Sequence, residues 1–239
     1  MTGRCDHVWD RSLEPWRPRT FMRCVKCGAI RRDFEHYVVM LTLDMPVESV
    51  LDVGTGNKGP VAEHYWVNYK RIKRGYVCDI WTIKENLNPI WVKLKMNALD
   101  LLDVLGPRSV DVVQAFGFLE HLEKEDGYRF LEIAERLARK LVIVSGAISF
   151  HGPTPDYKVK IDGNPYHLYR SLWRHEEFHR IGWQTDWEYY ARGESYMGDV
   201  IAWKFVDPTW RRKSGLGQAT RVGQLEEGPR PRPLFVAIP

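Results

Sequence analysis

The stretch of sequence that decides the fold is SVLDVGTGNKG, residues 49–59. Val50, Leu51 and Val53 form a short apolar run, which is typical of a strand buried on both faces of a sheet. The glycines that follow allow the backbone to turn sharply beneath a ligand. The stretch therefore predicts a strand, a tight cofactor-binding turn and the start of a helix.

The glycines of this turn fit two cofactors. Gly54, Gly56 and Gly59 match the G-x-G-x-x-G pattern of dinucleotide-binding turns, so spacing alone does not separate NAD from S-adenosylmethionine (SAM). Asp52, two positions before the first glycine, separates them by charge. A carboxylate there would repel a pyrophosphate but hold the cationic amino group of SAM. The charge favours SAM, with Thr55 among the expected contacts.

With Asp52, Gly54 and Gly56 in these positions, the chain resembles class I SAM-dependent methyltransferases, whose first motif runs apolar-apolar-Asp/Glu-x-Gly-x-Gly. The third glycine of the family falls on Lys58, one place before Gly59. The resemblance covers residues 50–206 and includes the Leu-Glu-His-Leu ending of the stretch 111–122. It implies a Rossmann-like α/β fold with a seven-stranded, mostly parallel sheet and helices on both faces. An NAD-dependent oxidoreductase is the alternative enzyme.

Hydrophobic periodicity predicts the elements of that sheet. Strands alternate with helical stretches, which favours parallel pairing, and a final pair of strands is expected to form an antiparallel hairpin. The predicted helices are 60–71, 124–140 and 173–181, and the predicted strands after residue 59 are 75–80, 91–96, the start of 111–122, 141–145, 184–191 and 199–206.

Asp79, at the end of the strand 75–80, is expected to accept hydrogen bonds from the two ribose hydroxyls, a role that suits SAM and NAD equally. The resemblance implies that residues 97–100 lie beside the adenine, where Asp100 would accept the exocyclic amine. The remaining cofactor contacts that the resemblance implies are Ile80, Ala98, Leu99, Ala115 and Phe116.

A long polar and aromatic connection, residues 146–171, is expected to form the acceptor side of the site, because long loops in compact domains are usually lids or binding loops. Methyl transfer to a hydroxyl or a protonated amine requires removal of a proton. His121, His151 and His167 are the candidate bases, and His151 is preferred because it follows the fifth strand of the parallel sheet. The acceptor itself is not identified, with a small molecule or glycan favoured over nucleic acid.

Three of the four cysteines lie near the N-terminus in a C-x-H-x16-C-x2-C pattern. Cys5, His7, Cys24 and Cys27 have the residue types and spacing of a tetrahedral zinc site, with short strands expected over 19–23 and 29–32 as in a zinc ribbon. A disulfide, a redox pair and ordinary buried cysteines are the alternatives. Four protein ligands would make the zinc structural, because no position is left for a substrate.

The composition indicates one principal domain within a chain of 239 residues, 44% of them hydrophobic. We expect a zinc-binding segment over 1–35, a methyltransferase domain over 36–207, and a basic tail over 208–239 that is disordered or draped over the surface. No apolar run approaches the roughly 20 residues of a membrane span, so cytoplasmic residence is the default expectation. The basic ends leave open a non-catalytic protein that binds nucleic acid through a methyltransferase fold.

Overall fold

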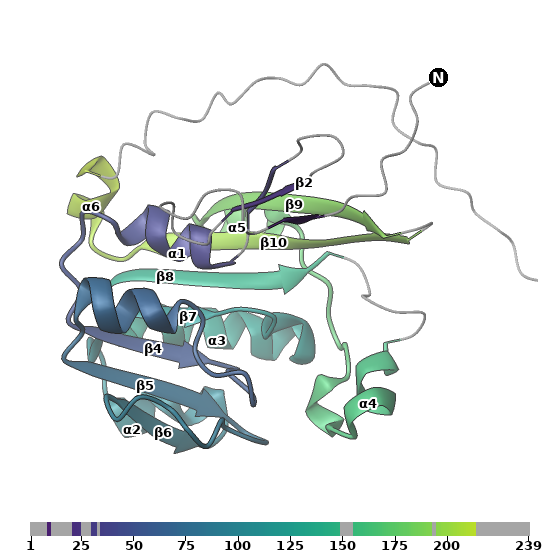
Figure 1. Ribbon diagram of the computed structural model, residues 1–239, viewed down its shortest axis with the longest axis horizontal. Helices are drawn as coiled ribbons and strands as arrows, with labels where there is room; N and C mark the ends of the chain where they lie inside the picture. Colours follow the sequence, from purple (N-terminus) through teal and green to yellow (C-terminus); the bar gives the residue numbers. More distant parts are fainter. Residues whose placement is uncertain are drawn as a thin grey trace, which may run out of the picture.

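A central sheet organises the computed structural model, which describes residues 9–10, 21–24, 30–32, 34–148, 155–192 and 195–213. Its strands span Ser49–Val53 (β4), Arg74–Asp79 (β5), Trp91–Lys95 (β6), Val110–Ala115 (β7), Ala138–Ala147 (β8), Gln184–Arg192 (β9) and Ser195–Phe205 (β10). Across the sheet they follow the order β6-β5-β4-β7-β8-β10-β9 (Figure 1). The first strand of this sheet in the sequence, β4, therefore lies inside the sheet. β5 and β6 extend the sheet on one side of β4, and β7, β8, β10 and β9 extend it on the other.

The pairing of the strands confirms the predicted mostly parallel sheet. β4, β5, β6, β7 and β8 are all parallel to one another, whereas β10 is antiparallel to both β8 and β9. Every residue of β4 and β7 is buried, as expected for strands covered on both faces. The seven strands, with β10 and β9 as the closing antiparallel pair, form a Rossmann-like α/β fold.

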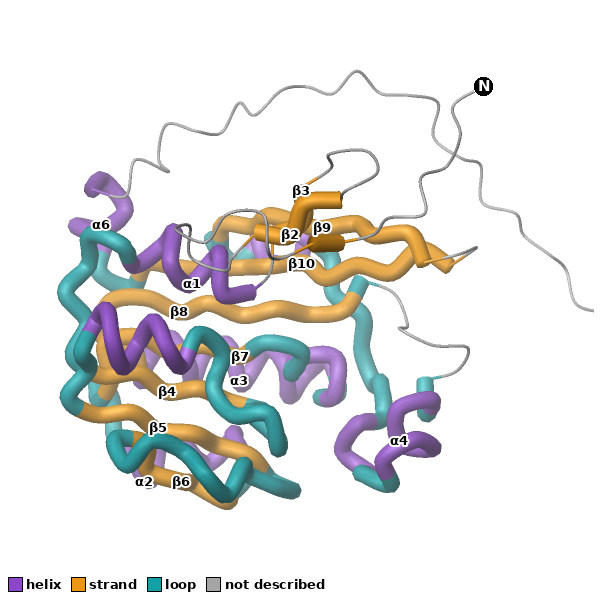
Figure 2. Tube along the Cα trace, viewed as in Figure 1, coloured by secondary structure: helices purple, strands orange, loops and turns teal. Residues whose placement is uncertain are grey.

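Helices cover both faces of the sheet (Figure 2). Helix α1 and the π-helix η1 pack on one face, in a cluster that contains Tyr37 and Trp66, while α2, α3 and α5 pack on the other around Phe130 and Phe178. The α-helices span Phe34–Thr42 (α1), Leu101–Leu105 (α2), Lys124–Leu137 (α3), Tyr157–Asp162 (α4), His175–Arg180 (α5) and Pro208–Lys213 (α6), and the other helices Tyr65–Lys70 (η1), Ala98–Asp100 (η2), Leu119–His121 (η3) and Pro165–His167 (η4).

The helix predicted over 60–71 is shorter than expected and begins late. The structure has only η1, because the backbone before it is committed to other partners: the amide of Val61 donates to the Asp52 side chain at 2.8 Å, and its carbonyl accepts from the Gln114 side chain at 2.8 Å. Ala62 adopts φ 58°, which interrupts a right-handed helix. Side chains from the sheet thus override the helical spacing.

The helix predicted over 124–140 ends at Leu137, and β8 begins three residues before the predicted strand 141–145. Asp111 explains the difference. Its carboxylate accepts from Arg139 Nε at 2.9 Å and lies 3.2 Å from Lys140 Nζ, so these two residues are held beside β7 in extended conformation. The predicted helix 173–181 likewise reduces to α5, since Trp173 is buried in the core ahead of it.

Three short strands pair separately near the N-terminus: Trp9–Asp10 (β1), Phe21–Cys24 (β2) and Ile30–Arg32 (β3), all antiparallel. They match the strands predicted over 19–23 and 29–32. Cys5, His7 and Cys27 lie outside the described residues. Among the residues that the structure describes, no group of three His, Cys, Asp or Glu side chains could hold a metal ion.

In the predicted tail, 208–239, helix α6 forms the first six residues, and residues 214–239 lie outside the described part of the chain. No described helix is both long and apolar enough to span a membrane.

Candidate functional site

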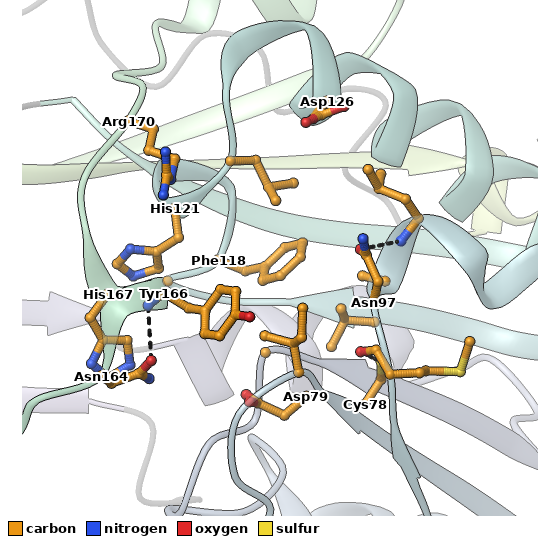
Figure 3. A pocket seen from close by; sticks show the side chains of 18 of the residues that line it. Cys78, Asp79, Asn97, Phe118, His121, Asp126, Asn164, Tyr166, His167 and Arg170 are labelled. Atoms are coloured by element: carbon orange, nitrogen blue, oxygen red, sulfur yellow. Dashed lines mark hydrogen bonds between the residues drawn. The ribbon is translucent and has the colours of Figure 1, made fainter.

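A cavity of about 270 Å³ lies at the carboxyl ends of the parallel strands (Figure 3). It lies where the strand order reverses between β4 and β7, the position at which open α/β sheets bind ligands. The strand ends contribute Val53 and Gly54 at the end of β4, Cys78, Asp79 and Ile80 at the end of β5, Met96, Asn97, Ala98 and Leu99 after β6, and Gly117 and Phe118 after β7.

The glycine turn after β4 forms one wall of this cavity. Gly54 and Gly56 have φ angles of 76° and 55°, in the left-handed region that side chains other than glycine rarely adopt. The amide of Gly54 donates to the carbonyl of Cys78 at 2.8 Å, which holds the turn against β5. A Cβ on Gly54 would lie 2.7 Å from Cδ2 of Phe118, so no side chain fits at this position.

Asp79 stands at the end of β5, in the position predicted for a ribose-binding carboxylate. Its Oδ2 accepts from the amide of Gly56 at 2.9 Å, and its Oδ1 accepts from the amides of Trp81 at 2.8 Å and Thr82 at 3.1 Å. A carboxylate has about four acceptor positions, of which these backbone groups use three. Asp79 can therefore accept a further hydrogen bond from a ligand hydroxyl in the cavity.

Asp52 lies beneath the turn and does not line the cavity. The residue is 2% exposed, and its Oδ2 accepts from the amide of Val61 and from Nε2 of Gln114, whose Oε1 in turn accepts from Trp66 Nε1 at 3.1 Å. Burial raises the pKa of Asp52 to about 7, although the hydrogen bonds from Gln114 and Val61 oppose that rise. The carboxylate thus shapes the turn from below, and its predicted contact with the amino group of SAM stays a prediction.

We expect Asp52→Asn to flatten the pH dependence of stability. Because the pKa of Asp52 is about 7 in the folded protein and its ordinary value is 3.8, the folded protein holds an extra proton between these two pH values. The free energy of unfolding should then fall as pH rises from about 4 to about 7, by on the order of 4 kcal/mol for a shift of this size. Asparagine keeps an acceptor for Val61 and Gln114 but does not ionise. Urea unfolding at a series of pH values measures the difference.

Asp103→Asn is the control for this experiment, because Asp103 is exposed on α2. The free energy of unfolding of Asp103→Asn should change with pH between pH 4 and pH 7 as steeply as that of the wild type. Parallel pH profiles for the wild type and Asp52→Asn would contradict the buried, protonated state inferred for Asp52.

The structure divides the remaining predicted cofactor residues into two groups. Ile80, Ala98 and Leu99 line the cavity, together with Asp79 and Gly54. Thr55, Ala115 and Phe116 are buried and do not line the cavity. Asp100 is exposed to solvent and does not line the cavity either. Phe116 instead stacks on Phe34 with ring centroids 4.8 Å apart. The next two residues after it, Gly117 and Phe118, reach the cavity, so the residues predicted at the carboxyl end of β7 stop short of the lining.

Two of the three candidate bases meet on the acceptor side of the cavity. The rings of His121 and His167 have centroids 5.4 Å apart, and both residues line the cavity (Figure 3). His151, the preferred candidate from sequence, lies outside the described residues. The connection 146–171, which the sequence marked as the acceptor side, also brings Asn164, Tyr166 and Arg170 to the cavity, and of these only Arg170 was not expected there.

No family model and no curated protein matches the sequence. Among solved structures, magnesium protoporphyrin IX methyltransferase from Synechocystis PCC 6803 with bound SAH is 18% identical, with 70% of this chain and 80% of that chain covered at a TM-score of 0.47. A SAM-dependent methyltransferase from Archaeoglobus fulgidus is 15% identical (70% and 90% covered, TM-score 0.45). The 1,6-didemethyltoxoflavin-N1-methyltransferase of Burkholderia thailandensis is 16% identical (71% and 76% covered, TM-score 0.48). Because these identities are low, we infer function from the site itself.

Proposed function

We propose that this protein is a SAM-dependent methyltransferase. The observation that carries the proposal is Asp79, which lies in the cavity at the end of β5 with an acceptor position left for a ribose hydroxyl. The glycine turn beside it brings bare backbone to the same cavity, which allows a nucleoside to approach closely. The position of the cavity, at the strand ends where the strand order reverses between β4 and β7, supports a ligand of this kind.

The surroundings of the turn support SAM over a dinucleotide. A pyrophosphate is bound by free amides at the start of a helix that follows the glycine turn directly. Here the amide of Val61 donates to the Asp52 carboxylate, and the first helix after the turn, η1, begins only at Tyr65. Asp52 thus takes the place that an anionic group of the ligand would need.

We assign the cofactor contacts to residues that line the cavity: Gly54, Asp79, Ile80, Ala98 and Leu99. Bound SAM supplies a methyl group activated by a sulfonium. The protein then has to align the acceptor with that methyl group and, for a hydroxyl or a protonated amine, to take up a proton. His121 and His167 are placed for this role, and His151 stays a candidate from sequence.

The proposal is tested by incubating the purified full-length protein with methyl-labelled SAM and fractionated cell extract. We expect label to appear in one class of acceptor, with a small molecule or glycan favoured over nucleic acid, and to disappear with Asp79→Ala. A fold retained only for binding would leave every fraction unlabelled, which would contradict the enzymatic proposal.

We also propose a structural zinc site formed by Cys5, His7, Cys24 and Cys27. The antiparallel pairing of the short strands supports it, because Cys24 ends β2 and pairs with Trp9, which follows His7 by two residues in the sequence. β3 then begins at Ile30, three residues after Cys27, so the C-x-x-C pair connects two antiparallel strands as in a zinc ribbon.

Elemental analysis of the purified protein should give about one zinc per chain, the number that a single four-ligand site holds. Cys24→Ser should lower the zinc content and leave SAM affinity nearly unchanged, because the proposed ligands are separate from the cavity residues. A wild-type zinc content as low as that of Cys24→Ser would contradict this assignment. So would a loss of SAM binding in a Cys24→Ser variant that is still folded.

A further inference from the structure

His167 is oriented by a carboxylate that lies outside the cavity. Its Nδ1 is 2.5 Å from Oδ2 of Asp162, and only the histidine of this pair lines the cavity. Burial alone would raise the pKa of Asp162, but the hydrogen bonds from the Asn164 amide and the His167 ring outweigh it and lower that pKa. An ionised carboxylate can only accept, so Nδ1 of His167 donates to it, and in the neutral form of the ring the lone pair lies on Nε2.

His121, the neighbouring ring, also contacts the segment that carries His167. Its Nδ1 lies 3.2 Å from the carbonyl oxygen of Leu168, and its ring packs edge-on against Tyr169 at 5.1 Å. A carbonyl dipole stabilises a developing imidazolium less than a carboxylate does. The carboxylate contact of His167 is therefore the geometric reason to assign the base to this ring.

The segment that carries His167 is fixed to the wall of the cavity. The side chain of Asn164 accepts from the amide of Tyr166 at 2.9 Å, and its carbonyl accepts from the amide of His167 at 3.0 Å. Further along, the amide of Arg170 donates to the carbonyl of Glu120 at 2.8 Å, which ties the segment to η3. The histidine is thus held in place before any acceptor binds.

Aromatic rings adjoin this histidine. Tyr166 precedes it in the chain and, in the view of Figure 3, lies between Phe118 and Asp79. Trp81 lies beside Tyr166, with ring centroids 6.0 Å apart, and the two residues are 45% and 43% exposed respectively. Large aromatic side chains left this exposed next to a cavity favour a flat apolar ligand.

We propose that the methyl acceptor is an aromatic hydroxyl, deprotonated by Nε2 of His167 while Asp162 holds the opposite side of the ring. The inference rests on the proposed methyltransferase function. The O–H bond of the acceptor breaks and its proton moves to Nε2, while the oxygen forms a bond to the methyl carbon and the carbon–sulfur bond breaks with its electron pair left on sulfur. The imidazolium then releases the proton to water. The products are an aryl methyl ether and the demethylated cofactor.

A hydroxyl explains why the site would hold an oriented base. A neutral aromatic amine already presents a lone pair, and a carboxylate is already ionised at neutral pH. A protonated amine also needs a base, but it is not the flat apolar group that the exposed rings favour. A phenolic hydroxyl, with a pKa of about 10 as in tyrosine, is still protonated and gains from a positioned base. Asp162 acts in this scheme as a positioning residue and His167 as the catalytic residue.

Three single-ring probes that differ only in the acceptor group test the chemical class: phenol, aniline and benzoate. With the full-length protein and SAM, we expect the methyl ether of phenol and no product from the other two. Methylation of aniline or benzoate with phenol unchanged would overturn the proposal, and so would the absence of all three products when SAM binds. If calorimetry shows no SAM binding at all, the proposed function itself fails instead.

The residue roles are tested by His167→Ala and Asp162→Asn. We expect His167→Ala to lower kcat for phenol roughly 100-fold or more, with partial rescue by added imidazole, and Asp162→Asn to lower kcat about tenfold with an unchanged KM. His175→Ala is the matched control, because His175 also pairs with a carboxylate, Glu176 at 3.2 Å, but does not line the cavity. This variant should keep the wild-type kcat.

The nitrogen NMR shifts of His167 give a readout that does not depend on activity. For the neutral ring of the wild type we expect the tautomer protonated at Nδ1, and for that of Asp162→Asn a mixture of both tautomers. A wild-type ring protonated at Nε2, or an unchanged kcat in His167→Ala, would overturn the assignment of the base.

Discussion

Replacing Gly54 by alanine should greatly weaken SAM binding in a protein that still folds. Gly54 has a φ of 76°, and an added Cβ would lie 2.7 Å from Cδ2 of Phe118, which lines the same cavity. Either the turn shifts or Phe118 moves toward the space that the nucleoside requires, and overpacking of this kind costs about 1–3 kcal/mol before any ligand contact is lost. We expect the Kd for SAM to rise by roughly 100-fold or more in a calorimetric titration.

Gly106→Ala separates the clash from the backbone strain. Gly106 has nearly the same φ, 75°, but an added Cβ there would meet no heavy atom within 4 Å, and the residue does not line the cavity. Both variants should therefore lose stability through φ strain, and only Gly54→Ala should lose affinity for SAM. Equal SAM affinities in the two variants would show that the turn does not contact the cofactor.

Trp173→Ala should cause the largest loss of stability among single substitutions in the described part of the chain. The side chain is fully buried between α3 and β8, so close that a Cβ on Gly127 or Gly146 would lie 2.3 Å or 2.8 Å from its ring. Lys124 Nζ lies 3.8 Å from the ring centroid on the side of α3. Removing a buried tryptophan costs about 3–5 kcal/mol. Urea unfolding should give a loss within that range.

The same substitution should disturb the acceptor side of the site. Nε1 of Trp173 donates to Oγ of Ser171 at 2.9 Å, and that hydroxyl donates to the carbonyl of Leu119 in η3 at 3.1 Å. We expect methyl transfer to fall more than SAM affinity, since Asp79 and the glycine turn are held by other contacts. Trp81→Ala is the control for stability, because this exposed ring should contribute less than about 1 kcal/mol to folding. Similar losses for both variants would contradict the packing role of Trp173.

The sheet and the strand ends could be predicted because their signals are local. Apolar runs separated by turn residues indicate strands, and the carboxyl ends of parallel strands meet at one edge of the sheet. Gly54 and Asp79 therefore came together in the cavity as expected. The antiparallel pair β9 and β10 followed from two strand-like segments separated by glycines.

The rest depends on contacts between residues far apart in the sequence. Asp52 was assigned to the cofactor because nothing in the sequence shows that Gln114, on β7, lies beside it and that its carboxylate is buried. The side of the strand on which Phe116 or Phe118 points changes with a single residue of register, which motif spacing does not fix. The pair of Asp162 and His167 depends on the conformation of an irregular segment, for which the sequence has no periodic signal.

The most direct test of the central proposal is a calorimetric titration of the full-length protein with SAM, its demethylated product and NAD. We predict that SAM and its product bind with roughly micromolar affinity, that NAD gives no binding heat, and that Asp79→Ala removes the response to SAM. Tight binding of NAD with no response to SAM would contradict the proposal and indicate an oxidoreductase instead.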